Sequence, residues 1–257
     1  MIIDTHAHLY YEEVLSDLDG VLERAQNIGI TKIIVPAVDL KTSREIIELS
    51  EKHDMIYCAV GIHPCDVKNS KLEDLEEIAE LCGHPGVVAI GETGLDYYWD
   101  SSNAEAQKEF FKLQIELAKD KELPVVIHTR DSVRDAIRVI TENYGSGLKG
   151  QFHCFSGDTN DVRNILALDG FYISFCGNVT FKNYKDTDII KETPVERMLS
   201  ETDSPFLTPV PNRGKPNEPA NVIYTIRKIS EIKGVSEEDL TATLYSNAGK
   251  LFTKITL

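Results

Sequence analysis

Short apolar runs alternate with longer amphipathic segments along the whole chain, and this pattern most limits the folds available to it. Strands are predicted over residues 1–5, 32–36, 55–61, 87–91, 124–129, 150–155, 171–175 and 198–201. Helices are predicted over residues 12–28, 43–53, 72–82, 104–119, 132–144, 158–168, 222–233 and 237–252. The apolar runs are nearly continuous, which is typical of parallel strands buried on both faces.

Eight strand-and-helix units of roughly thirty residues each favour a parallel (β/α)8 TIM barrel. We expect one domain over residues 1–257, slightly irregular in its last units, where the seventh and eighth strands are the weakest. The segments 177–188 and 208–219 are predicted to be long loops. An open doubly wound sheet is the alternative. Its dinucleotide-binding form has a glycine-rich turn after the first strand, where this chain has His6-Ala7-His8.

Composition narrows the class of protein. The net charge of −15 argues against a broad grip on duplex nucleic acid, although it leaves room for a small anionic substrate. The five cysteines are odd in number and lack C-x-x-C spacing, so a disulfide framework is not expected. We find neither a secretory signal pattern nor a membrane-spanning apolar run. We therefore expect a cytoplasmic protein without a membrane partner.

Polar side chains follow most of the predicted strands, where a barrel carries its chemistry. His6 and His8 are two residues apart on an extended chain, so both imidazoles face the same side. An isolated H-x-H is more often part of a turn, and the case for a metal depends on partners elsewhere. The other strand ends supply His63, Glu92, Asp96, His128, Arg130, His153 and Asp203. Such a cluster of imidazoles and carboxylates predicts a metal site.

Strand order divides these ligands into two sets. The first and eighth strands are neighbours in a closed barrel, so His6, His8 and Asp203 can share one cation. The fourth, fifth and sixth strands are consecutive, so Glu92, His128 and His153 can share another, with Glu92 bridging the two. We predict two divalent metal ions (Mg, Mn or Zn). Cys154 follows His153 directly and should face the opposite way on a strand, so we leave it out.

Several motifs together resemble the TatD family of metal-dependent deoxyribonucleases, within the amidohydrolase-like TIM-barrel hydrolases. They are D-T-H-A-H-L at 4–9, G-I-H-P at 61–64, G-E-T-G-L-D-Y at 91–97, P-V-V-I-H-T-R at 124–130, H-C-F-S-G at 153–157, E-T-D-S-P at 201–205 and R-G-K-P-N-E-P at 213–219. The resemblance covers essentially the whole chain. It implies metal ligation by His6, His8, Glu92, His128, His153 and Asp203. It also implies removal of nucleotides from a DNA 3′ end.

Roles follow as hypotheses. Asp203 and Glu92 are the predicted catalytic residues, with Asp203 as general base; a purely structural role as a ligand is the alternative for Asp203. Candidate substrate-binding residues are His63, Arg130, Lys182 and Arg213, and ordinary hydrogen-bonded, ion-paired or solvated roles compete with each. Asp96 is a predicted partner of a ligand histidine. The aromatic run Tyr97-Tyr98-Trp99 could stack on an exposed base, or pack under a loop.

The predicted substrate is a DNA end or short single-stranded nucleic acid, bound by a monomer. Two other functions stay open. The same cradle would serve a metal-dependent ester or amide hydrolase, such as an aminoacyl-tRNA deacylase or a small-molecule amidohydrolase. A non-enzymatic binding protein with a relic metal site is the third hypothesis, although all six ligand positions carry a residue that can bind a metal.

Overall fold

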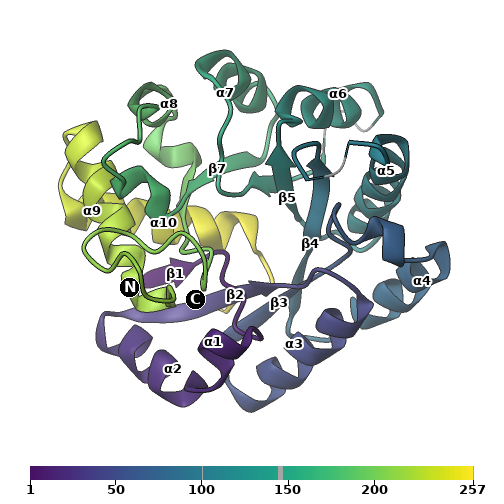
Figure 1. Cartoon of the computed structure of the whole chain (residues 1–257), viewed down its shortest axis with the longest axis horizontal. Helices are drawn as coiled ribbons and strands as arrows, with labels where there is room; N and C mark the ends of the chain where they lie inside the picture. The colour runs from purple at the N-terminus through teal and green to yellow at the C-terminus, as the bar shows by residue number, and fades with distance from the viewer. Residues whose placement is uncertain (100, 144–146, 257) are drawn as a thin grey trace.

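Eight parallel strands form one sheet that curls into a barrel, with helices around its outside (Figure 1). The computed structural model describes residues 1–99, 101–143 and 147–256. The strands are β1 (Ile2–Asp4), β2 (Ile30–Pro36), β3 (Ile56–Val60), β4 (Val87–Asp96), β5 (Val125–Arg130), β6 (Gly150–Phe152), β7 (Phe171–Phe175) and β8 (Met198–Ser200). They lie side by side in chain order, and every neighbouring pair is parallel. The predicted (β/α)8 barrel is confirmed.

The helices are α1 (Glu12–Leu15), α2 (Leu18–Asn27), α3 (Leu40–Lys52), α4 (Leu72–Leu81), α5 (Ala104–Asp120), α6 (Val133–Asn143), α7 (Thr159–Leu166), α8 (Thr187–Glu192), α9 (Val222–Lys233) and α10 (Glu237–Leu251). Single 3-10 turns lie at Val67–Asn69, Gly177–Thr180, Val195–Arg197 and Pro219–Asn221. Among the described helices, none combines the length and the apolar character that a membrane crossing requires.

The predicted segments 12–28 and 177–188 contain other elements than expected. The helix expected over residues 12–28 is divided, because Asp17 has a non-helical backbone (φ −134°) and stands at the N-cap of α2. Aspartate competes for backbone hydrogen bonds and favours such positions. The predicted loop 177–188 contains a 3-10 turn and the start of α8. Its glycine and asparagine residues concealed these short elements.

Hydrogen bonds between the ends of β1 and β8 bring the edges of the sheet together. The backbone amide of Asp203 donates to the carbonyl of His6 at 2.9 Å. The buried Asp4 carboxylate accepts from the amide of Thr202 at 3.0 Å and from its hydroxyl at 2.6 Å. Burial raises the pKa of Asp4 to about 8, against these hydrogen bonds. The contacts fix the first and last strands beside each other, as the predicted metal site requires.

The core has two parts. The larger lies between the outer faces of the strands and the helices. The smaller lies inside the barrel at the amino-terminal ends of the strands, where α10 and the residues after it cover the opening (Figure 1). Its fully apolar lining includes Ile3, Ile34, Ala59, Val88, Val126, Leu199, Ala248, Leu251 and Phe252. The polar strand ends therefore collect at the opposite opening, which we call the mouth.

Candidate metal centre

Glu92 lies at the middle of the polar cluster in the mouth, with only 2% of its surface exposed. The β4 register shifts between Ile90 and Thr93, and Gly91 and Gly94 have φ values of +148° and +131°. A side chain at Gly94 would place its Cβ 2.1 Å from the carbonyl oxygen of His128. These two glycines therefore let β4 bulge and pass closely over β5, so that Glu92 points into the barrel.

The first group of donors comes from β1 and β8. The Nε2 atoms of His6 and His8 lie 3.2 Å apart. Asp203 Oδ1 is 3.7 Å from His6 Nε2 and 3.5 Å from His8 Nε2. Glu92 Oε2 is 3.4 Å and 3.6 Å from the same two nitrogens. These atoms surround one point and could hold a divalent cation.

The second group surrounds the other oxygen of Glu92. Glu92 Oε1 is 2.9 Å from His128 Nδ1 and 2.8 Å from His153 Nε2, and these two nitrogens are 3.2 Å apart. His63 Nε2 also approaches this oxygen, at 3.4 Å. The rings of His6 and His153 stack at 3.9 Å, so the two groups adjoin. His63, predicted to bind substrate, thus lies among the donors together with Glu92 and His128.

Electrostatics show how this cluster fits a cation. Burial opposes ionisation of Glu92, yet His153, His63 and His6 hold its pKa well below the ordinary value. Burial also disfavours a charged imidazole, but Glu92 and Glu201 raise the pKa of His153 well above its ordinary value. Burial lowers the pKa of His6 and of His63. The raised pKa of His153 shows that positive charge beside Glu92 is favoured. Divalent cations bound by neutral nitrogen and carboxylate oxygen would supply that charge.

Buried groups outside the cluster orient its histidines. Asp96 Oδ2 lies 3.0 Å from His128 Nε2, so the predicted partnership of Asp96 with a ligand histidine is present in the structure. A carboxylate accepts this ring proton and leaves Nδ1 free to face Glu92. His8 Nδ1 lies 3.0 Å from the Tyr10 hydroxyl. Both ring orientations are therefore set from the side away from the donor groups.

Sequence reasoning missed Glu201, which is fully buried beneath His153. Glu201 Oε2 accepts from Gln151 Nε2 at 2.7 Å and from Ser174 Oγ at 2.8 Å, while Oε1 lies 3.6 Å from His153 Nδ1. One signal was available: Gln151 precedes His153 by two residues, so both face the barrel interior. The structure adds a supporting layer below the donors.

Cys154 lies beyond the end of β6. The predicted strand 150–155 ends at Phe152, so strand alternation does not decide where Cys154 points. Its φ is +42°, its amide donates to Glu201 Oε1 at 2.6 Å, and its sulfur lies 2.9 Å from Cys176 Sγ. Cys154, Cys176 and Glu201 form a group separate from the two that share Glu92.

Comparisons with known proteins agree with this geometry. The family model described as TatD related DNase matches residues 3–253. The chain belongs to this family. A Bacillus subtilis relative, the uncharacterized metal-dependent hydrolase YabD, is 44% identical, with 98% of this chain and 99% of that protein covered. The Escherichia coli K12 relative YcfH, described in the same words, is 36% identical over 98% of this chain and 95% of its own length.

Solved structures of the TatD family have the same fold. The Escherichia coli K12 TatD homologue YJJV superposes with a TM-score of 0.93 at 29% identity, covering 98% of each chain. A TatD-family hydrolase from Entamoeba histolytica gives 0.88 at 28% identity, over 99% and 98% of the two chains. This chain is therefore a metal-dependent hydrolase of the TatD family.

The remaining predicted substrate-binding residues lie outside the donor groups. The Arg130 guanidinium lies over the Tyr98 ring at 3.9 Å. Arg213 lies over Phe181 at 4.0 Å and donates to the Thr208 carbonyl. Lys182 is exposed in the segment before α8. The first two are held by aromatic rings, whereas Lys182 extends into solvent.

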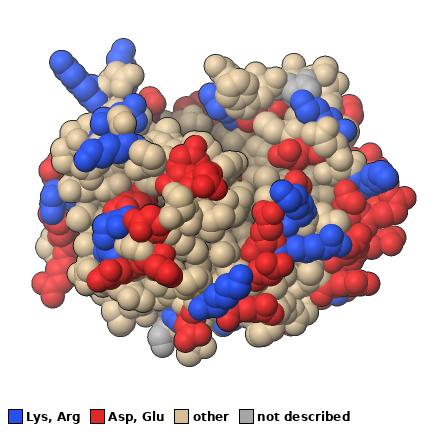
Figure 2. Space-filling model, turned by 60° about the horizontal axis from the view of Figure 1, so that its bottom comes forward, with Lys and Arg blue, Asp and Glu red and all other residues tan. Residues whose placement is uncertain are grey.

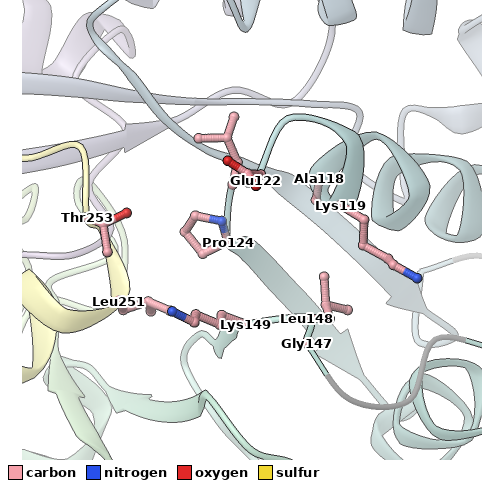
Figure 3. Close-up of a pocket in the computed structure, with 10 residues that line it drawn as sticks. Ala118, Lys119, Glu122, Pro124, Gly147, Leu148, Lys149, Leu251 and Thr253 are labelled. Carbon is pink, nitrogen blue, oxygen red and sulfur yellow. The ribbon is translucent and has the colours of Figure 1, made fainter.

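A separate pocket lies at the opposite end of the barrel (Figure 3). Its lining includes Leu123 and Pro124, which precede β5, Lys149, which precedes β6, and Leu251 and Thr253 at the end of α10. All of these residues adjoin the amino-terminal ends of the strands, away from Glu92. The donor cluster at the mouth contributes nothing to this pocket.

Proposed function

We propose that this chain is a deoxyribonuclease that uses two divalent cations, Mg, Mn or Zn, to hydrolyse DNA phosphodiester bonds from the 3′ end. One observation carries the proposal: the two oxygens of Glu92 face separate groups of donors. Oε2 faces His6 and His8, whereas Oε1 faces His128 and His153. A single carboxylate between two ligand sets would suit two cations close enough together to act on one phosphodiester.

The ligands would be His6, His8 and Asp203 on one side, His128 and His153 on the other, and Glu92 between them. The bound cations would neutralise the charge that develops on the phosphate and lower the pKa of water in the site. The amidohydrolase alternative demands the same cradle. The description of the matching family model as a DNase favours the phosphodiester.

Asp203 is the proposed general base. Burial disfavours its charge, but His8, His6 and His153 keep the pKa of its carboxyl below the ordinary value, so it is ionised at neutral pH. Its side chain is 13% exposed, against 3% for Glu92, so water reaches it. Asp203 takes the proton as water oxygen bonds to phosphorus of the terminal nucleotide. The bond from phosphorus to the preceding 3′ oxygen breaks, and that oxygen takes a proton from solvent.

Charge on the surface supports a small footprint on the substrate. Lys and Arg are interspersed with Asp and Glu over the face in Figure 2, and no continuous basic stripe crosses it. The net charge is −15. A long duplex would need many phosphate contacts. Contact with a few nucleotides at a strand end requires only local cations such as Arg130.

The test uses single-stranded oligonucleotides labelled at the 3′ or the 5′ end, incubated with the full chain and Mg²⁺, Mn²⁺ or Zn²⁺. The 3′ label should leave first as a mononucleotide, while the 5′ label should give a shortening ladder. Asp203→Asn at saturating metal should lower the rate by about 10²- to 10⁴-fold, the range for loss of a general base. Asp131→Asn, an exposed aspartate beyond β5, is the matched control and should retain the wild-type rate.

Hydrolysis of aminoacyl esters with no oligonucleotide cleavage under any metal would reject the nuclease and favour the ester hydrolase. Full activity of Asp203→Asn would instead remove Asp203 as the base and leave the substrate assignment standing.

A further inference from the structure

Two large aromatic side chains are exposed beside the candidate metal centre. Tyr98 is 56% exposed and Trp99 is 66% exposed. Their ring centroids lie 5.1 Å apart in an edge-to-face arrangement. Exposed aromatic surface of this size next to a site commonly marks a binding surface. We call Tyr98, Trp99 and the adjacent Arg130 the aromatic platform.

The platform is tied to the metal centre through one buried carboxylate. Asp96 Oδ1 accepts from the backbone amides of Tyr98 at 3.0 Å and Trp99 at 2.9 Å. Asp96 Oδ2 lies 3.0 Å from His128 Nε2. Asp96 is only 1% exposed, so both contacts are sheltered from water. The aromatic backbone and a donor histidine are therefore held by the two oxygens of a single side chain.

Arg130 gives the platform a positive charge. Its guanidinium lies 3.9 Å from the Tyr98 ring centroid and 5.3 Å from that of Trp99. Arg130 is exposed, and it makes no salt bridge to a carboxylate among the described residues. A flat cation on an aromatic ring can face a phosphate while the neighbouring ring stays open for stacking.

We propose that the aromatic platform binds an unpaired nucleobase of a single-stranded nucleic acid, with Arg130 on an adjoining phosphate. The inference rests on the proposed nuclease function, because it places a base next to the scissile phosphodiester. Base stacking on aromatic rings with a nearby cation is how many proteins hold single strands without reading sequence. Within a duplex the base faces are covered by neighbouring base pairs, so the platform favours unpaired bases of single strands or frayed ends.

Trp99 provides a direct readout because the chain contains one tryptophan. The metal-loaded full chain is titrated with a single-stranded phosphorothioate oligonucleotide, which resists hydrolysis, while Trp99 fluorescence is recorded. Stacking should quench the emission. An abasic strand of equal length carries the same phosphates without bases and should leave the emission nearly unchanged, as should a blunt duplex. Equal quenching by the abasic strand would overturn the inference.

Kinetics give a second readout through the ratio of kcat/KM for the base-bearing strand over the abasic strand. Trp99→Ala should lower this ratio by about 5- to 150-fold, the range for one lost base–aromatic stack, and Trp99→Phe should restore most of it. Leu72→Ala is the control, because Leu72 is also an exposed large apolar side chain, 48% exposed, at the start of α4. An unchanged ratio in Trp99→Ala would overturn the inference.

The experiments can reject the inference about the platform and the proposed nuclease function independently of each other. If no strand is hydrolysed, the nuclease proposal fails and the fluorescence titration alone decides the platform. Base-dependent quenching then supports it, and its absence rejects it. If strands are hydrolysed with the same kcat/KM whether or not they carry bases, the nuclease stands and the platform is rejected.

Discussion

The two ends of the barrel are built by the same strands and have opposite chemistry. On β5, Val126 points inward and joins the apolar cluster beneath α10, while His128, two residues later on the same face, joins the donors around Glu92. Two residues along a strand span roughly 6.6 Å. Burial of apolar surface therefore stabilises one end of the barrel, whereas burial of charged groups at the other end costs free energy unless a counter-ion is present.

The residues that stabilise the fold and the residues that could bind metal therefore lie at opposite ends of each strand. The amino-terminal end is filled by side chains such as Phe252 and Leu251 and has little to gain from a ligand. At the mouth, Glu92, Asp203 and Glu201 lie among buried imidazoles, and the carboxylates raise the pKa of His153. A substitution at one end should thus leave the property of the other end nearly unchanged.

The largest expected effect comes from Glu92→Gln, which keeps the shape of the side chain and removes its charge. Both donor groups lose the charge of the carboxylate that they share, so metal-dependent hydrolysis should fall by about 10³-fold or more. Metal titration followed by calorimetry should show the loss of at least one site.

Glu201→Gln is the companion variant, since Glu201 is equally buried but lies behind His153, with Oε1 3.6 Å from His153 Nδ1. It should lose much less activity than Glu92→Gln. If the two variants lost equal activity, the position of Glu92 between the donor groups would not explain the effect of Glu92→Gln.

Phe252→Ala tests the other end of the barrel. Phe252 is fully buried in the apolar cluster, so the free energy of unfolding should fall by about 3–5 kcal/mol, measured by urea denaturation. Activity at 25 °C should stay near that of the parent, because the residue is remote from Glu92. Phe252→Leu, which retains more volume, should lose less stability. A fall in metal affinity in Phe252→Ala would show that the two ends are coupled.

Asp96→Asn should have the smallest effect of the three. Asparagine still accepts from the amides of Tyr98 and Trp99, but its NH₂ group cannot accept the ring proton of His128. His128 then loses the tautomer that presents Nδ1 to a metal. Loss of such a partner typically lowers metal affinity or activity by about 10- to 100-fold.

Asp135→Asn is the control for Asp96→Asn, since Asp135 accepts from the Tyr97 hydroxyl at the same mouth without contacting a donor histidine. Metal affinity is measured for both variants by calorimetry. An effect of equal size in the control would mean that general charge at the mouth, and not the His128 contact, sets the affinity.

Sequence periodicity predicted the eight strands because buried parallel strands are continuous apolar runs. It also brought six distant side chains to one mouth, since parallel strands end at the same edge. It was less successful where geometry depends on local irregularity. β4 extends to Asp96 through a bulge at Gly91, and α2 begins after a break at Asp17. Hydrophobic periodicity indicates neither the bulge in β4 nor the break before α2.

Several contacts across the barrel could not be predicted from the sequence either. His63 belongs with Glu92 and His128, Glu201 lies beneath His153, and Cys154 meets Cys176 from the next strand. Each pairing depends on where a strand stops and which way the following residue turns. Those choices are set by packing against neighbouring strands.

By itself, the sequence determined the order of strands, the apolar faces and the chemical types gathered at the strand ends, because these follow from period and position along the chain. Only the tertiary structure decided that one oxygen of Glu92 faces His6 and His8 while the other faces His128 and His153. The reason is physical: distances of about 3 Å between residues far apart in the chain depend on barrel closure and on the bulge in β4.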